Sequence, residues 1–230
     1  MTNLRGVRTW LSPAGTAAAA VAVGGAVLAG TGWRGFAVLA AFLVTGSLLT
    51  PGGGRRRAVQ VVANGGVAAL CALLALADPR WTLAFGGAVA AAAADTWSTE
   101  LGGRSGAVPR LITTWRRVEP GTSGGVTLVG TLGGLGGAIV IGALARLVGL
   151  VTTAGAGWTI LAGFAGCLAD SLLGATVQIR YRCAACGALG ESSQHGCGGT
   201  GLRASGITAI TNDTVNFLAT LVGAAVAVVL

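Results

Sequence analysis

The sequence predicts an all-α, polytopic membrane protein in which about seven helices form a single transmembrane helical bundle. Hydrophobic residues make up 53% of the 230 residues, charged residues make up only 10%, and the mean hydropathy is +0.77. A soluble domain of this size would need a polar outer shell that these residues could not supply. The apolar residues also gather in stretches of about twenty, a length that crosses the hydrocarbon core of a bilayer.

Turn signals and arginine clusters divide this apolar sequence into spans. The first span begins at Pro13, and we interpret it as a helix rather than a cleaved signal because the apolar character continues along the chain. The second ends at Thr50-Pro51-Gly52, where proline and glycine stop a helix. The predicted spans are residues 13–30, 33–50, 58–77, 81–101, 124–149, 157–180 and 206–230. Residues 1–230 are therefore expected to form one membrane domain, whose 41 glycines suit close helix packing and would permit a homodimer.

The basic residues predict the orientation of these spans. All fifteen are arginines, and seven spans distribute them very unevenly between the two sides. One side holds Arg34, Arg80 and Arg146, and the side of the N-terminus holds Arg5, Arg8, Arg55, Arg56, Arg57, Arg104, Arg110, Arg116, Arg117, Arg180, Arg182 and Arg203. Because positively charged loops stay in the cytoplasm, we expect a cytoplasmic N-terminus in the cell membrane. The net charge of +8 follows this topology, so no nucleic-acid partner is expected.

Most of the seven acidic residues lie within or beside apolar spans, and three of these are candidates for a function. Asp95 and Asp170 each follow a long apolar run, and Asp213 lies just before the apolar C-terminal tail. A carboxylate in a membrane-spanning helix costs about 2.5–3.5 kcal/mol on insertion scales, so such residues usually serve a function. We predict that all three are catalytic and bind Mg²⁺. The alternatives are ion pairs with arginine and hydrogen bonds that fix helix packing.

Polar residues near these acids are predicted to bind the substrate or a nucleotide. Helical spacing places Ser98 on the same face as Asp95, whereas Glu100 lies on a neighbouring face and is alternatively an interfacial residue. The predicted orientation puts all of these polar positions in the cytoplasmic half of the bundle. The set comprises Asn64, Ser98, Glu100, Ser171, Gln178, Asn212 and Asn216.

A loop rich in glycine and hydroxyl residues, 119–127, precedes the fifth span. Backbone N–H groups at a helix N-terminus bind anions, and glycine lets a phosphate approach them closely. The loop lacks the Gly-Lys-Ser/Thr ending of a Walker A motif, and a simple turn is the alternative. Nearby arginines would add phosphate contacts, although topology also explains them. The predicted binding residues are Arg110, Arg117, Glu119, Gly121, Thr122, Gly124 and Gly125.

The predicted cytoplasmic loop 181–205 contains three of the five cysteines and the single histidine. Cys183, Cys186, His195 and Cys197 could together form a structural Cys₃His zinc site, and a reducing cytosol argues against a disulfide. The short spacing between the last two ligands is unusual for zinc, so a loop without metal is the alternative. Cys71 and Cys167 fall inside spans and are expected to pack as small apolar residues.

Several of these motifs together resemble an integral-membrane family known as domain of unknown function number ninety-two. The matching motifs cover roughly residues 60–220. They are Ala94-Asp95-Thr96-x-Ser98-x-Glu100-Leu101-Gly102, Glu119-Pro120-Gly121-Thr122-x-Gly124-Gly125-Val126, Ala169-Asp170-Ser171, Cys183-x-x-Cys186 and Asn212-Asp213-x-Val215-Asn216.

This family includes the plant phytyl-phosphate kinase of tocopherol synthesis. The resemblance therefore implies a kinase that uses a nucleoside triphosphate, such as CTP, to convert an isoprenoid monophosphate into its diphosphate at the cytoplasmic membrane face. The predicted Mg²⁺ ligands would bridge the phosphates, and phosphoryl transfer needs mainly positioning and charge stabilisation. The first alternative is a small-solute or ion transporter that uses intramembrane carboxylates. A lipid-binding protein without turnover is the second.

Overall fold

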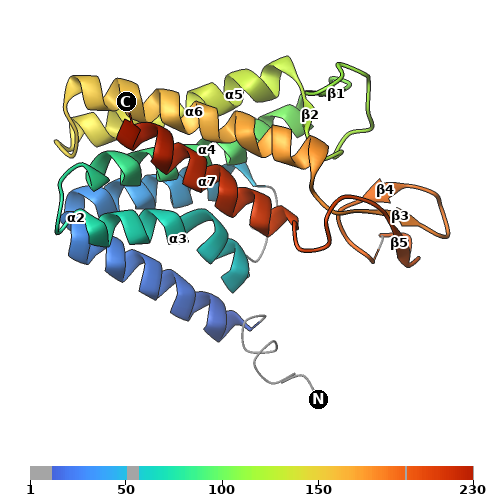
Figure 1. Cartoon of the computed structure of the whole chain (residues 1–230), viewed down its shortest axis with the longest axis horizontal. Helices are drawn as coiled ribbons and strands as arrows, with labels where there is room; N and C mark the ends of the chain where they lie inside the picture. Colours follow the sequence, from blue (N-terminus) through green and yellow to red (C-terminus); the bar gives the residue numbers. More distant parts are fainter. Residues whose placement is uncertain (1–11, 51–56, 195, 230) are drawn as a thin grey trace.

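The computed structural model describes residues 12–50, 57–194 and 196–229, and helices account for most of them (Figure 1). The helices are α2 (Pro13–Leu49), α3 (Ala58–Leu74), α4 (Trp81–Arg104), α5 (Leu128–Leu147), α6 (Thr153–Thr176) and α7 (Asn212–Val229). The strands are β1 (Arg110–Leu111), β2 (Gly125–Val126), β3 (Arg180–Cys183), β4 (Leu189–Gly190) and β5 (Gly201–Ser205).

Helix α2 consists of two rods that meet at Gly32. This residue has φ 65° and ψ −164°, which interrupts the helix and which side chains other than glycine rarely adopt. The second rod folds back along the first, so that a Cβ on Gly24 would lie 3.5 Å from the ring of Phe36. These rods correspond to the predicted spans 13–30 and 33–50, so the structure contains seven helical rods among its described residues.

Four of the described helices have the properties of membrane spans. Helices α2, α5, α6 and α7 are long and apolar enough to cross a bilayer, and α3 is a shorter apolar helix. Large apolar side chains on their outer surfaces are exposed, as at Leu132 and Leu161, which suits contact with lipid. The predicted helical membrane bundle is therefore confirmed, although several helices differ from their predicted bounds, most of all those predicted at 124–149, 157–180 and 206–230.

Helix α4 lies at the centre of the bundle and packs against α2, α3, α5, α6 and α7 (Figure 1). Its residues from Ala84 to Ala94 are all buried, and most of them are alanine or glycine. Small side chains let neighbouring backbones come close: a Cβ on Gly137 of α5 would lie 2.9 Å from the carbonyl oxygen of Ala93. The buried apolar run before Asp95 is thus a packing surface for five neighbouring helices.

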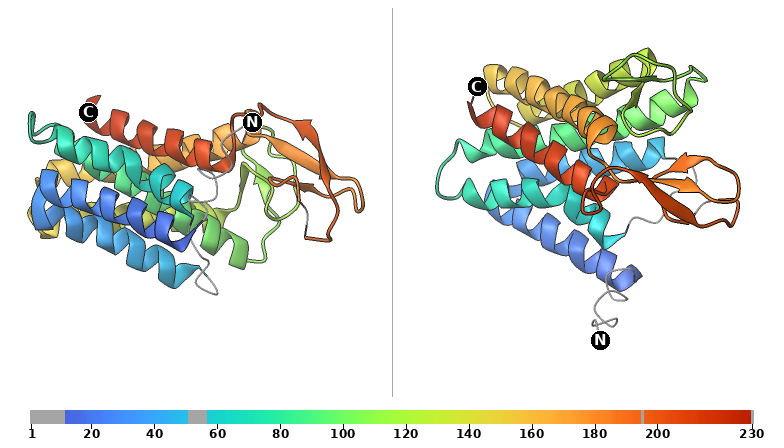
Figure 2. Two further views of the ribbon diagram at one scale, coloured as in Figure 1. Left: turned by 90° about the horizontal axis from the view of Figure 1, so that it is seen from below. Right: turned by 45° about the vertical axis from the view of Figure 1, so that its right-hand side comes forward.

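Two small antiparallel sheets, which the all-α prediction did not include, lie at one end of the bundle (Figure 2). Strands β1 and β2 pair within the segment between α4 and α5, and β4, β3 and β5 form a three-stranded sheet in that order. The segment before α7 also differs from the prediction of a span beginning at residue 206. Its Ile207 N–H donates to the carbonyl of Val177 and its Ile210 carbonyl accepts from Ile179, so the helix begins only at Asn212.

We predict that Gly137→Ala destabilises the protein, whereas Gly136→Ala does not. The new Cβ at Gly137 would meet the Ala93 backbone, which cannot move without shifting α4, at a cost of about 1–3 kcal/mol. At Gly136 the nearest atom is a Trp97 ring carbon at 3.8 Å, an ordinary contact. Thermal unfolding of the purified variants in detergent would measure the difference, and equal melting temperatures would contradict the close packing of α4 and α5.

Candidate functional site

A polar cavity of about 820 Å³ lies at the end of the bundle that carries the two sheets, where Gly125 and Val126 of β2 and Glu191 after β4 line it. It is lined by the last turns of α2, α4 and α6, the first turns of α3, α5 and α7, and the segment 120–127. The sequence predicts that the unusual polar residues share one side of the membrane, and the structure confirms that they share one end of the bundle. Which side of a membrane this end faces stays a prediction.

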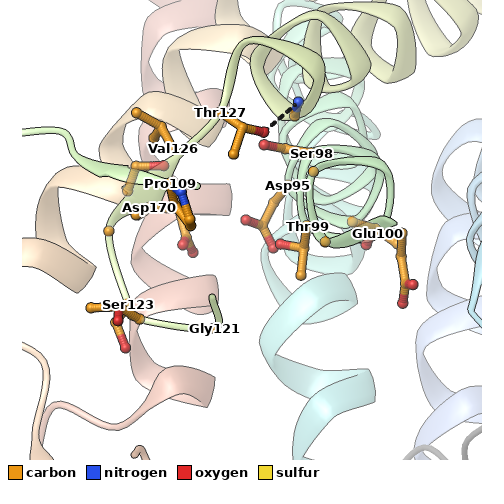
Figure 3. A pocket seen from close by; sticks show the side chains of 18 of the residues that line it. Asp95, Ser98, Thr99, Glu100, Pro109, Gly121, Ser123, Val126, Thr127 and Asp170 are labelled. Atoms are coloured by element: carbon orange, nitrogen blue, oxygen red, sulfur yellow. Dashed lines mark hydrogen bonds between the residues drawn. The ribbon is translucent and has the colours of Figure 1, made fainter. Parts of the chain in front are cut away.

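Two carboxylates from neighbouring helices meet inside this cavity. Asp95 comes from α4 and Asp170 from α6, and their side chains point into the same space (Figure 3). The two carboxyl groups are close enough to interact directly. Oδ2 of Asp170 is buried and has no hydrogen-bond partner among the described residues. An oxygen in this state can accept a metal ion or a proton donor from a ligand.

Among the described residues, every charged side chain that lines the cavity is acidic. Its ionisable side chains are Asp95, Glu100, Asp170 and Glu191, and no arginine from the described parts of the chain lines it. Glu100 has its own partners, because Thr50 donates to Oε1 at 2.9 Å and Arg104 lies 3.7 Å from Oε2. The other three carboxylates have no ion pair among the described residues, so the cavity attracts cations.

Glu191 was not predicted as a site residue. It follows β4 in the cysteine-containing segment, and its Oε1 accepts a 2.6 Å hydrogen bond from Ser123 of the glycine-rich loop. No hydrophobic periodicity points to this position in the sequence. The one available signal was the scarcity of acids, since Glu191 is one of only seven in the chain.

The glycine-rich loop forms one wall of the cavity, and four of its predicted binding residues line it: Gly121, Thr122, Gly124 and Gly125. It is pressed against the end of α6: Gly124 has φ 76°, and a Cβ there would lie 2.5 Å from the Ala175 backbone. The N–H of Gly125 donates to the Thr122 carbonyl at 2.9 Å, so this donor is used within the turn itself. The loop therefore packs closely against α6, and its predicted role in binding phosphate stays a prediction.

Arg180 holds this loop against the end of α6 without lining the cavity itself. Its Nη2 donates to the carbonyls of Ser123 at 2.9 Å and of Gly174 at 2.7 Å, which joins the loop to the end of α6. The guanidinium does not line the cavity. In the sequence Arg180 is only a topology signal, because its position after a helix does not reveal that it donates to two carbonyls.

The amide and hydroxyl residues predicted as ligands do line the cavity. They are Asn64, Ser98, Ser171, Gln178, Asn212 and Asn216. Gln178 lies just beyond the end of α6 rather than within it, because that helix ends at Thr176. Its side chain is buried, and Nε2 has no hydrogen-bond partner among the described residues, so it remains available to donate to a ligand.

Four predicted site residues lie outside the cavity lining: Asp213, Arg110, Arg117 and Glu119. Asp213 follows Asn212 by about 100° around α7, so it faces α3 and lies 3.3 Å from Arg57. Arg110 folds back on its own turn and donates to the Trp115 carbonyl at 2.8 Å. The structure thus supports the alternative of an ion pair for Asp213 and gives the predicted arginines no contact with the cavity.

An apolar groove of about 300 Å³ adjoins the polar cavity. Both rods of α2 and the first turns of α3 form it, with Val23, Phe36 and Leu39 among the lining residues. Asn64 lines the groove and the cavity alike. The site therefore combines an acidic region with an apolar one that joins it at Asn64.

Cys183, Cys186 and Cys197 gather at the tip of the three-stranded sheet, with their sulfur atoms within 4.8 Å of one another. Backbone N–H groups of Cys186 and Ala185 donate to the Cys183 sulfur, and they lower the pKa of its thiol to about 7. His195, the fourth predicted zinc ligand, lies outside the described residues. Cys71 and Cys167 are buried inside the bundle, as expected.

A bundle of membrane-length helices with a polar cavity at one end defines a multi-pass integral membrane protein. The chain belongs to the family described as integral membrane protein DUF92, whose model matches residues 3–224. This membership confirms the resemblance found in the sequence motifs.

Two plant proteins and one archaeal protein illustrate the similarity. Protein PGR of Arabidopsis thaliana is 33% identical over 231 residues, which cover 83% of this chain and 79% of that protein. Protein VTE6, chloroplastic, from the same plant is 28% identical over 191 residues, covering 74% of this chain and 57% of that protein. An uncharacterized membrane protein of Methanocaldococcus jannaschii is 44% identical over 126 residues, 52% of this chain and 50% of that protein. No solved structure matches the chain.

We predict that Asp170→Asn stabilises the protein in a chelating buffer. Its free energy of unfolding should rise by about 1 kcal/mol, and its melting temperature should rise with it. The change removes one of the carboxylates that crowd the cavity, and Oδ2 of Asp170 has no protein partner to lose. Asp78→Asn is the matched control, because Asp78 is ion-paired with Arg80 at 2.8 Å and does not line the cavity. Thermal unfolding measures both, and a large destabilisation by Asp170→Asn would show that this residue serves packing.

Proposed function

We propose that the protein is a phosphotransferase that moves the terminal phosphoryl group of a nucleoside triphosphate, such as CTP, to an isoprenoid monophosphate. The observation that carries this proposal is the acidic cavity at one end of a membrane bundle, joined at Asn64 to an apolar groove. An amphiphilic lipid phosphate and a nucleotide would meet there, with divalent cations between them and the carboxylates. Membership in a family that includes the phytyl-phosphate kinase, and the similarity to Protein VTE6, favour this reaction.

The lining of the cavity fits Mg²⁺ as the cofactor. Phosphates repel carboxylates, so a cavity lined by Asp95, Asp170 and Glu191 without a basic residue among its described lining residues would need cations to hold them. Mg²⁺ usually binds one or two carboxylates together with phosphate oxygens and water, and the partnerless Oδ2 of Asp170 fits this pattern. When bound, the ion would neutralise charge that develops on the transferred phosphoryl group.

The protein side chains would position the reactants. An oxygen of the lipid monophosphate attacks the terminal phosphorus of the nucleotide, the bond to the bridging oxygen breaks, and a nucleoside diphosphate leaves. This acceptor oxygen is already anionic, so no general base is required. Gln178, whose buried Nε2 has no partner among the described residues, would donate to a phosphate oxygen. Asn64 lies where the polar head of the lipid would meet its apolar tail.

The position of the carboxylates favours this reaction over transport. Transporter sites usually lie near the middle of the bilayer, between discontinuous helices. Here the cavity opens at one end of the bundle, where the loop 120–127 and Glu191 form part of its wall, and Asp95 and Asp170 reach it from within α4 and α6. Under the positive-inside rule this end would face the cytoplasm, where nucleotides are supplied.

We predict that the purified protein in nanodiscs converts phytyl, geranylgeranyl or farnesyl monophosphate into the diphosphate with Mg²⁺ and CTP or ATP. Asp95→Asn should lower kcat roughly 10²–10³-fold, because it removes charge that would hold the metal at the reacting phosphates. The measurement is product formation followed by mass spectrometry across all pairs of donor and acceptor.

The control for this experiment is again Asp78→Asn, which removes a carboxylate that pairs with Arg80 outside the cavity and should keep full activity. No diphosphate with any pair, from protein whose thermal unfolding is normal, would contradict the kinase. Cation flux in liposomes that depends on Asp95 would then favour the transporter.

We predict that Ala40→Phe, which fills the apolar groove, raises KM for a long-chain acceptor roughly tenfold. A short acceptor such as dimethylallyl monophosphate would not reach the groove, so its KM should stay unchanged. Val44→Phe is the matched control, because Val44 lies on the same rod with 56% of its surface exposed and does not line the groove. Equal effects of Ala40→Phe on long and short acceptors would contradict a tail in the groove.

A further inference from the structure

We propose that Cys183, Cys186 and Cys197 bind a structural zinc ion that fixes the segment carrying Glu191 against the cavity. The proposal concerns a site outside the cavity and does not depend on which reaction the cavity performs. It rests on four features of this segment: the spacing of the sulfur atoms, the backbone around them, the scarcity of buried side chains, and the contact of Glu191 with the cavity wall.

The sulfur atoms have the spacing of metal ligands. Sγ of Cys197 lies 3.5 Å from Sγ of Cys183 and 3.6 Å from Sγ of Cys186. A disulfide would bring two sulfurs to about 2.05 Å. Around a tetrahedral zinc ion with Zn–S bonds of about 2.3 Å, the sulfurs lie about 3.8 Å apart. The observed separations are thus close to those of a zinc site, and all three pairs are within 4.8 Å.

The backbone near the cysteines directs N–H groups at sulfur. Ala185 and Cys186 donate to the Cys183 sulfur, and Ala188 donates to the Cys186 sulfur. Gly187, directly after the second cysteine, has φ 74°, and Gly198, directly after the third, has φ 82°. Both turns therefore bend sharply after a cysteine. N–H groups that point at sulfur stabilise thiolates, which are the form that binds metal.

The segment also lacks the apolar interior that would hold it together without a metal. From residue 181 to 205, Cys183 is the only buried side chain among those described. Gly199 packs against the cluster, and a Cβ there would lie 2.7 Å from the Cys183 sulfur. A small sheet with so little buried surface usually requires a disulfide or a metal. The described cysteines form no disulfide, so a metal is the cross-link that fits this segment.

Zinc binding would affect the cavity through the position of Glu191. This residue directly follows β4, which pairs with β3, and β3 ends at Cys183. The metal would hold the turn after β3 and the Cys197 turn together, and so fix the sheet edge from which Glu191 accepts the hydrogen bond of Ser123. The zinc would thereby act on the cavity as a positioning element and not as a catalyst. Soft thiolate ligands favour zinc over Mg²⁺, so the two predicted metals would not compete for one site.

The test is metal analysis of the full-length protein, purified under reducing conditions without chelators. We expect about one zinc per chain by mass spectrometry of the metal content. Cobalt exchange should give the visible bands and near-ultraviolet charge transfer of tetrahedral thiolate coordination. Cys183→Ser should lose most of the metal, whereas Cys71→Ser, which changes a buried cysteine inside the bundle, should keep it.

A second measurement does not require a variant to fold. Removal of zinc from the native protein should increase hydrogen exchange in residues 181–205 and in the loop that contains Ser123, but not in α3. Zinc below a tenth of one equivalent in protein with intact thiols, or no thiolate signature after cobalt addition, would overturn the zinc site. Unchanged exchange in the Ser123 loop would overturn the positioning of Glu191. Neither outcome depends on phosphoryl transfer.

Discussion

The repulsion between carboxylates around one cavity is the constraint that the rest of the structure must accommodate. Asp95, Asp170 and Glu191 approach one another with no arginine in the described lining to balance them. The helix dipoles do not remove the problem, because the C-terminal ends of α2, α4 and α6 meet the N-terminal ends of α3, α5 and α7 there, and their opposite partial charges roughly offset. Stability must therefore come from elsewhere, and the alanine and glycine surface of α4 is the main source.

The close packing of α4 also determines the geometry of the cavity. Because Ala93 and Ala94 touch the glycines of α5 directly, the backbone of α4 is fixed immediately before Asp95. Asp170 is fixed in a similar way, since Gly163 and Gly166 bring α6 against α4. A carboxylate whose helix cannot shift keeps its distance to its neighbour in the absence of a ligand. Such preorganisation is what metal-assisted phosphoryl transfer would require.

The sequence predicted the parts of this structure that periodicity and membrane physics determine. Apolar length gave the helices, and the arginine asymmetry correctly grouped Asp95, Asp170 and Asn216 at one end. The sequence could not show which of the neighbouring residues Asn212 and Asp213 faces the cavity. A shift of one residue at the start of the helix decides which side chain faces the cavity and which faces Arg57. Nor could the sequence reveal Glu191, whose position depends on a sheet with few apolar residues. Contacts between distant loops leave no periodic signal.

The two walls of the cavity differ in what holds them in place. On the bundle side, Asp95 and Asp170 stand on helices that buried backbone contacts fix. On the loop side, Glu191 depends on a sheet without an apolar core, and Ser123 depends on two carbonyl bonds from Arg180. The loop wall is therefore the less stable of the two, because local stability follows buried contacts. Under the proposed reaction the cavity would admit a nucleotide from water and a lipid from the bilayer, and this less buried side is where it would open while the pair of aspartates stays fixed.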